Sequence, residues 1–238
     1  MDKSGLFIKR FQRLEKLLKE TTESKDETSF SSALTKAAEK NTFIQKNRSL
    51  IDDLYALRNV FSHRERQRYI AKVNEIAISE LEKIIQNIEK PPTVISRFKG
   101  YGETVYQATI DRTIFEVMSE MEDPKKKYTH VPVWNRSKFV GVFSYTSFFA
   151  WLFDEQKNKD KEVTFVKKFI GDINPEYLNS PVVNFEFIPE NMSLYEVPSL
   201  FEKAVSQRER LDCLLITRAG KRNEKITGII TSWDLGSI

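Results

Sequence analysis

Two side chains close together in the chain, Arg58 and His63, have the chemistry needed to act on a phosphodiester, and Asn59 directly follows the arginine. A histidine can transfer protons near neutral pH, and an arginine can hold a phosphate. Apolar residues around them recur at three- and four-residue spacing, which predicts an amphipathic helix. At about 100° per residue, His63 lies roughly opposite the apolar stripe, with Asn59 on the same outer face and Arg58 on the flank. The pattern therefore directs these polar side chains towards solvent or a partner chain. The stripe itself comprises Leu50, Leu54, Leu57 and Phe61.

This segment resembles the motif of the HEPN family, whose ribonuclease members carry Arg-x4-6-His with a polar residue, often Asn, after the arginine. Arg58, Asn59 and His63 match that motif position by position. The resemblance covers residues 1–90 and implies a small all-helical domain with the motif late in its third helix. It also implies that these three residues are catalytic and that a homodimer brings two copies of the motif together.

The pattern of residues 1–90 predicts helices and short connections, because the segment has no proline and no glycine after Gly5. We expect a first helix with a stripe from Phe7 to Leu18, a second from Phe30 to Lys40, the motif helix capped by Asn41, and a last helix from Arg68 to Glu89. Four such helices can form a bundle, and the last offers an apolar seam for a dimer contact. Pro91-Pro92 then ends the helical part.

The excess positive charge of the chain belongs to this helical part. Residues 1–90 carry 18 Lys and Arg against 14 Asp and Glu, whereas residues 91–238 carry 20 of each. The cations are dense directly after the motif. They either complement the dipole at a helix C-terminus or form a rim that follows phosphates, and charge alone leaves both interpretations open. These residues are Arg64, Arg66, Arg68 and Lys72.

The rest of the chain contains an internal repeat. A helix start, an apolar strand, a polar turn, a glycine-containing strand and a second helix start recur at intervals of 80 to 87 residues. We therefore predict an α+β protein in which an N-terminal all-α helical bundle precedes two βαββα units. The paired segments are 113–117 and 193–197, 130–133 and 213–216, 139–143 and 226–230, and 144–147 and 231–234.

These two units resemble CBS domains paired as a Bateman module. The second unit carries the family's ligand signature as Gly228, Thr231 and Asp234. The resemblance implies an adenosine nucleotide (AMP, ATP or a related species) as regulatory ligand, with Asp234 on the ribose and Thr231 near the phosphate. Helix capping by Thr and Asp is the alternative. The first unit reads Gly141, Ser144 and Ser147, with Ser in place of the expected Asp, so we expect one competent site of two.

The expected domains are residues 1–90, the first repeat at 93–155 and the second repeat at 163–238. The single cysteine, Cys213, falls in an apolar run that predicts a buried strand thiol, and it excludes a disulfide framework or a Cys-based zinc site. With only two histidines, His63 and His130, we expect no metal site and no cofactor for catalysis, and His130 is assigned no role. Without an apparent secretory signal or membrane span, a cytoplasmic location is expected.

Three functions fit these residues. The first is a metal-independent endoribonuclease in which the RNA 2′-hydroxyl attacks and leaves a 2′,3′-cyclic phosphate, regulated by nucleotide binding to the repeats. His63 would transfer the proton, Arg58 would stabilise the charge on the phosphate, and Asn59 would orient either the phosphate or the imidazole. The second is a non-catalytic nucleotide sensor whose helical domain only dimerises or docks a partner. The third is an RNA-binding module without turnover. The sequence does not favour it, because aromatic residues interleaved with basic ones, as in a base-stacking surface, are not evident.

Overall fold

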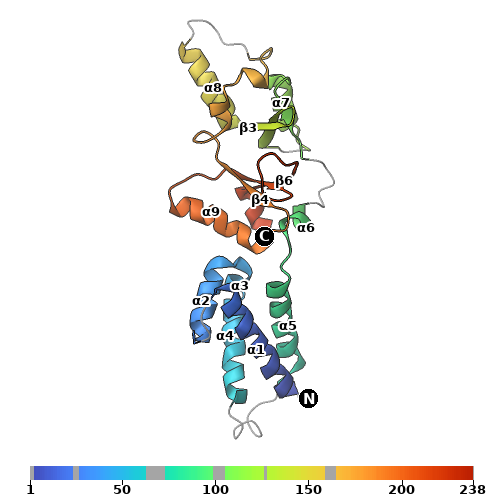
Figure 1. Cartoon of the computed structure of the whole chain (residues 1–238), viewed down its shortest axis with the longest axis vertical. Coiled ribbons are helices and arrows are strands. Elements are labelled where there is room, and N and C mark those ends of the chain that lie inside the picture. The colour runs from blue at the N-terminus through green and yellow to red at the C-terminus, as the bar shows by residue number, and fades with distance from the viewer. Residues whose placement is uncertain are drawn as a thin grey trace. The chain divides into compact units, whose positions relative to one another are not determined.

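The computed structural model describes residues 3–23, 27–62, 73–98, 105–125, 128–158 and 165–237. Contacts within the chain divide it into two units. The first contains Met1–Pro92 together with Ser193–Leu200, and the second contains Thr93–Met192 together with Phe201–Ile238. Figure 1 shows that helices alone build the N-terminal part and that strands appear only after it. Within the described ranges, no helix has both the length and the apolar character needed to cross a membrane.

The N-terminal part is a helical bundle, as predicted. The first helix, α1, packs against α2, α4 and α5, and its predicted stripe of Phe7, Phe11, Leu14 and Leu18 is fully buried. Ser29 caps α2 by accepting a hydrogen bond from the Ser32 backbone N–H, which fixes the predicted start at Phe30. The helices are α1 (Lys3–Thr21), α2 (Phe30–Lys40), α3 (Thr42–Lys46), α4 (Arg48–Ser62) and α5 (Glu75–Glu89).

Two predicted helix starts are wrong. Asn41 caps the short helix α3, because its side chain accepts hydrogen bonds from the backbone N–H groups of Phe43 and Ile44, and the motif helix α4 begins only at Arg48. The last helix of the bundle, α5, begins at Glu75 and does not include Val73 or Asn74 as predicted, whereas the predicted first residue, Arg68, lies outside the described residues. Asn74 accepts a hydrogen bond from the Ala77 N–H there and caps α5. A capping side chain thus sets the boundary where apolar periodicity alone extended the helix too far.

Two three-stranded sheets follow, and they have the same topology. In each, the first strand pairs parallel with the second, and the second pairs antiparallel with the third. This confirms the predicted duplication. The first sheet contains β1 (Ala108–Thr109), β2 (His130–Asn135) and β3 (Lys138–Ser144), and the second contains β4 (Phe185–Pro189), β5 (Cys213–Thr217) and β6 (Ile226–Thr231).

Each sheet has helices that follow its first and last strands. The helix after the first strand is of similar length in both repeats, with 8 residues in the first and 10 in the second. The terminal helix differs, because it has 14 residues in the first repeat and is only a six-residue 3₁₀ segment in the second. In the first repeat these helices are α7 (Ile114–Met121) and α8 (Tyr145–Asn158). The second repeat has η4 (Leu194–Glu196), α9 (Val197–Ser206) and η5 (Ser232–Ser237), while α6 (Val94–Phe98), η2 (Ile170–Asp172) and η3 (Pro175–Leu178) lie in the connections.

A shared apolar cluster joins the two sheets. Phe139 and Val142 of β3 pack with Cys213 and Leu215 of β5 and with Ile226 of β6, all of them nearly inaccessible to solvent. Cys213 is therefore the buried strand thiol that the sequence predicts, and burial raises the pKa of its thiol well above the usual range. The packing gives the two sheets a common apolar core.

Gly141 on β3 has no room for a side chain. An added Cβ would lie 2.3 Å from the backbone oxygen of Leu178, and backbone cannot rotate away as a side chain can. We expect Gly141→Ala to lower the free energy of unfolding by about 1–3 kcal/mol, measured by urea denaturation. Gly236→Ala is the control, since a Cβ there would meet no atom within 4 Å in the part of the chain that the structure describes. Equal stability of the two variants would contradict this expectation.

Candidate functional site

The predicted nucleotide motif lies where β6 ends and η5 begins. One carboxylate oxygen of Asp234, Oδ2, accepts hydrogen bonds from the Thr231 backbone N–H at 2.7 Å and from the Thr231 hydroxyl at 3.0 Å. Both side chains are half-buried. Gly228 lies three residues earlier on β6, and a Cβ there would meet the Ile216 side chain at 2.7 Å. The structure thus brings Thr231 and Asp234 into direct contact and gives Gly228 a packing role next to them.

The first repeat has the same hydrogen-bonded turn, built from two serines. The Ser144 backbone N–H donates to Ser147 Oγ at 2.7 Å, and the Ser147 N–H donates to Ser144 Oγ at 3.2 Å. Ser147 is fully buried, whereas Asp234 is not. Capping, the alternative interpretation of the motif, is therefore present in both repeats. Only in the second repeat does this turn contain a carboxylate, that of Asp234, which is partly accessible to solvent.

His130 lies at the start of β2, opposite Ser144 in the sheet register. Its Nδ1 is 2.9 Å from the Thr129 hydroxyl. Burial lowers the pKa of His130, Asp212 of the second repeat raises it, and Arg210 lowers it again. Asp212 is itself only 5% exposed; it forms an ion pair with Arg210 and accepts a hydrogen bond from the Asn184 N–H. His130 is thus half-buried and lies within electrostatic range of two charged residues of the second repeat.

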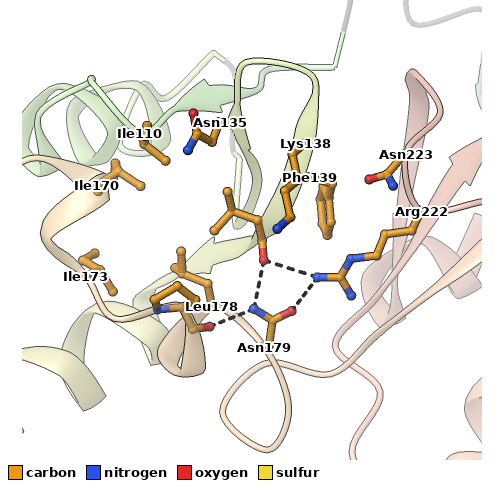
Figure 2. A pocket seen from close by; sticks show the side chains of 13 residues that line it. Ile110, Asn135, Lys138, Phe139, Ile170, Ile173, Leu178, Asn179, Arg222 and Asn223 are labelled. Carbon is orange, nitrogen blue, oxygen red and sulfur yellow. Dashed lines mark hydrogen bonds between the residues drawn. The ribbon is translucent and has the colours of Figure 1, made fainter.

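A pocket of about 580 Å³ lies at the opposite ends of the strands. Figure 2 shows that it receives side chains from the β2–β3 turn and from the β5–β6 turn. None of Gly228, Thr231 and Asp234 lines it. The sequence patterns did not predict this pocket. The signal that could have done so is the equivalent place of the two polar turns in the repeat. Its lining comprises Ile110, Asn135, Lys138, Phe139, Val140, Ile170, Gly171, Ile173, Pro175, Leu178, Asn179, Arg222 and Asn223.

Comparison with protein families assigns the first repeat. Residues 104–154 match the family model described as the CBS domain. The first repeat is a CBS domain. The match lies within the predicted first repeat, and the second repeat shares the sheet topology of this CBS domain.

Three solved structures are similar to part of this chain. An acetoin utilization protein (AcuB) of Vibrio cholerae is 15% identical, with a TM-score of 0.43 over 62% of this chain and 89% of that one. The CBS pair of protein MJ0100, solved with 5′-methylthioadenosine and S-adenosyl-L-methionine, is 16% identical (TM-score 0.37; 62% and 94% covered). The CBS domain of a bacterial CNNM/CorC family Mg²⁺ transporter in complex with ATP is 18% identical (TM-score 0.37; 66% and 92% covered). At these scores the likeness assigns no function. No curated protein matches the chain.

The HEPN-like motif of the helical part is only partly within the described residues. Arg58 follows Leu54 by one turn of α4 and is half-buried, so it lies closer to the buried face than the predicted flank position. Its Nη1 donates to Asn59 Oδ1 at 3.1 Å. Asn59 is half-buried as well, and Ile51 replaces Leu50 in the centre of the buried face. The remaining motif residue, His63, and the basic residues Arg64, Arg66, Arg68 and Lys72 lie outside the described residues.

Proposed function

We propose that this protein senses an adenosine nucleotide with its two repeats and that its helical domain is the regulated effector, a metal-independent endoribonuclease. The observation that carries the sensing function is the Thr231–Asp234 pair at the strand end of a repeat whose equivalent is a CBS domain. The half-buried Asp234 carboxylate suits two vicinal ribose hydroxyls, because an ionised carboxylate accepts several hydrogen bonds at once. We assign Thr231 to the phosphate of the nucleotide. We assign no nucleotide to the first repeat, because Ser147, which stands in place of the Asp, is buried.

The ribonuclease assignment rests on the chemistry of the motif formed by Arg58, Asn59 and His63, of which Arg58 and Asn59 lie on α4. RNA carries its own nucleophile, so the protein needs a proton-transfer group and a cation for the phosphate. His63 is assigned the first role and Arg58 the second. Asn59, whose Oδ1 accepts the hydrogen bond from Arg58, holds the guanidinium in place. The expected product is a 2′,3′-cyclic phosphate.

A second function, a non-catalytic sensor, is favoured by the state of Arg58. Its guanidinium is half-buried and hydrogen-bonded to its own neighbour, Asn59, as a purely structural arginine would be. In that case the helical domain would only dimerise or dock a partner. The two functions differ in one measurable property, because only the first includes turnover of RNA.

The deciding experiment incubates end-labelled RNA with the full chain in EDTA, with and without AMP, ATP or a cyclic dinucleotide. Cleavage that persists in EDTA and changes with a nucleotide supports the regulated ribonuclease. Nucleotide binding by calorimetry without cleavage supports the non-catalytic sensor. Absence of both would reject the proposal.

The motif supplies one histidine in each chain, which is insufficient for catalysis that requires an acid and a base, so we propose a homodimer with facing motifs. Two exposed apolar side chains of the helical domain, Val60 on α4 and Ile76 on α5, support such a contact; Ile76 is 70% exposed. We expect the chain to be a dimer at micromolar concentration by light scattering. A monomer that still cleaves RNA would contradict the composite site.

A short segment of the second repeat provides a route from nucleotide to effector. Ser193–Leu200, which includes the first residues of α9, belongs to the same contact unit as the helical bundle. The Tyr195 backbone oxygen accepts from the Thr42 hydroxyl at 3.0 Å, and the Tyr195 hydroxyl donates to Asn87 Oδ1 at 2.9 Å. Its ring stacks on Phe43 with the centroids 5.0 Å apart. A shift of this segment on nucleotide binding would therefore act directly on α3 and α5.

Replacing Tyr195 tests this route. We expect Tyr195→Ala to bind nucleotide as the wild type does but to lose the nucleotide effect on RNA cleavage, since a ligand shifts an equilibrium only through differential contacts. Tyr195→Phe keeps the stacking on Phe43 and loses the hydrogen bond to Asn87, so its effect should be intermediate. Calorimetry and the cleavage assay measure both properties. An unchanged nucleotide response in Tyr195→Ala would exclude the segment as the route.

A further inference from the structure

The pocket between the two turns has the features of a ligand site separate from the nucleotide motif. Strand β3 begins at Lys138, which lines the pocket, and ends at Ser144 in the repeated turn. At about 3.3 Å per residue, seven residues of strand place these ends roughly 20 Å apart. We propose that this pocket binds a small organic anion, a carboxylate or phosphate attached to an apolar body.

The charge of the pocket favours an anion. Two of its lining side chains, Lys138 and Arg222, are cationic, and none of the residues that line it is acidic. Lys138 and Arg222 are both exposed, so their charges face solvent rather than the core. Two further turn residues, Asn135 and Asn223, add neutral amide groups at the rim. A guanidinium with a nearby ammonium suits the oxygen atoms of a carboxylate or a phosphate.

Arg222 is held in position before any ligand arrives. Its Nη2 donates to the Val140 backbone oxygen at 3.3 Å and to Asn179 Oδ1 at 3.1 Å. The guanidinium carbon lies 5.1 Å from the centroid of Phe139 and 5.8 Å from that of Phe185. Figure 2 shows Arg222 beside Phe139 and its hydrogen bond to Asn179 on one side of the pocket. Because the side chain is already ordered, binding an anion costs less conformational entropy.

Asn179 is in turn fixed by the backbone. Its Nδ2 donates to the Val140 oxygen at 3.0 Å and to the Pro175 oxygen at 2.7 Å. The amide therefore serves to orient Arg222, and we assign Asn179 as a positioning residue without ligand contact.

The other side of the pocket is apolar. Ile170, Ile173 and Leu178 are buried there and Ile110 is half-buried, as Figure 2 shows for the side opposite Arg222. A volume of about 580 Å³ lies within the range of roughly 300–1,000 Å³ that small-molecule pockets occupy. An apolar surface facing a cationic one selects a ligand with both characters, and inorganic phosphate would use only half of the site.

Calorimetry on the full chain with four matched probes tests the proposal. Phenylacetate and phenyl phosphate supply an apolar ring with either anion, phenylacetamide removes the charge, and inorganic phosphate removes the ring. We expect the two ring-bearing anions to bind at least about tenfold more tightly than the other two probes. Comparing phenylacetate with phenyl phosphate decides which anion the site prefers.

Lys138→Gln locates the binding, because Lys138 is exposed and lines the pocket. We expect about a tenfold loss of affinity for the ring-bearing anions in this variant, with none in Lys225→Gln, which removes the same charge from a residue outside the lining. No heat from either anion up to millimolar concentration, equal binding of phenylacetamide, or equal loss in both variants would overturn the proposal. Nucleotide binding should be unchanged in Lys138→Gln. The experiment therefore tests the anion pocket independently of the proposed nucleotide site.

Discussion

His63→Ala is expected to abolish RNA cleavage, with a loss of at least about a hundredfold, because the proposed site then has no group to transfer the proton. Arg58→Ala should cause a similar loss, since the charge that develops on the phosphate is no longer compensated. Asn59→Ala should cost less, because Asn59 accepts the hydrogen bond from Arg58 and only orients it. The rate of cleavage of a labelled RNA in EDTA measures these effects, and mass spectrometry of the products detects the cyclic phosphate.

The matched control for Arg58→Ala is Arg48→Ala, an exposed arginine at the start of the same helix. It removes the same charge and should retain full activity. Thermal unfolding of each variant separates loss of catalysis from loss of fold, which matters for Arg58 because its side chain is half-buried. Wild-type cleavage by the His63→Ala protein, or a 5′-phosphate product, would refute the assignment.

Asp234→Ser is expected to remove nucleotide binding while preserving the local fold. The first repeat already shows that serine forms this turn, since Ser147 Oγ accepts a hydrogen bond from the Ser144 N–H at 2.7 Å. The substitution therefore keeps a cap for Thr231 and removes only the carboxylate proposed to bind the ribose. We expect the affinity for AMP or ATP, measured by calorimetry, to fall by about tenfold or more.

Asp234→Ala is the companion variant. It should lose nucleotide affinity to the same degree and also lose about 1 kcal/mol of stability, because the Thr231 N–H and hydroxyl lose their shared acceptor. If Asp234→Ser binds nucleotide as tightly as the wild type, the carboxylate is only a cap and the sensor assignment fails.

Local sequence patterns located most elements of the fold. The stripe from Phe7 to Leu18 and the bounds Phe30–Lys40 were predictable because burial of one helix face and a capping serine are properties of neighbouring residues. The duplicated sheets were predictable because both copies keep the same order of strand, turn and glycine. The starts of α4 and α5 were not predictable in this way. The apolar spacing extends beyond these helices, whereas capping residues such as Asn41 and Asn74 decide where a helix begins.

The amino-acid sequence by itself identified the candidate site residues. Arg58, Asn59, Thr231 and Asp234 are recognisable from type and spacing, and the last two are in fact hydrogen-bonded because three residues separate them across one turn. Relations between residues distant in the chain were decided only by the tertiary structure.

Three of these relations bear on function. Burial closes Ser147 to ligands, and the Ser193–Leu200 segment packs with the helical bundle. Lys138 and Arg222, which are more than 80 residues apart in the chain, line the same pocket. The spacing of apolar residues indicates which face of a helix or strand is apolar, but it does not indicate which other element covers that face. The packing of the two sheets through Phe139 and Cys213 supplies that information, and it brings both polar turns to the lining of one pocket.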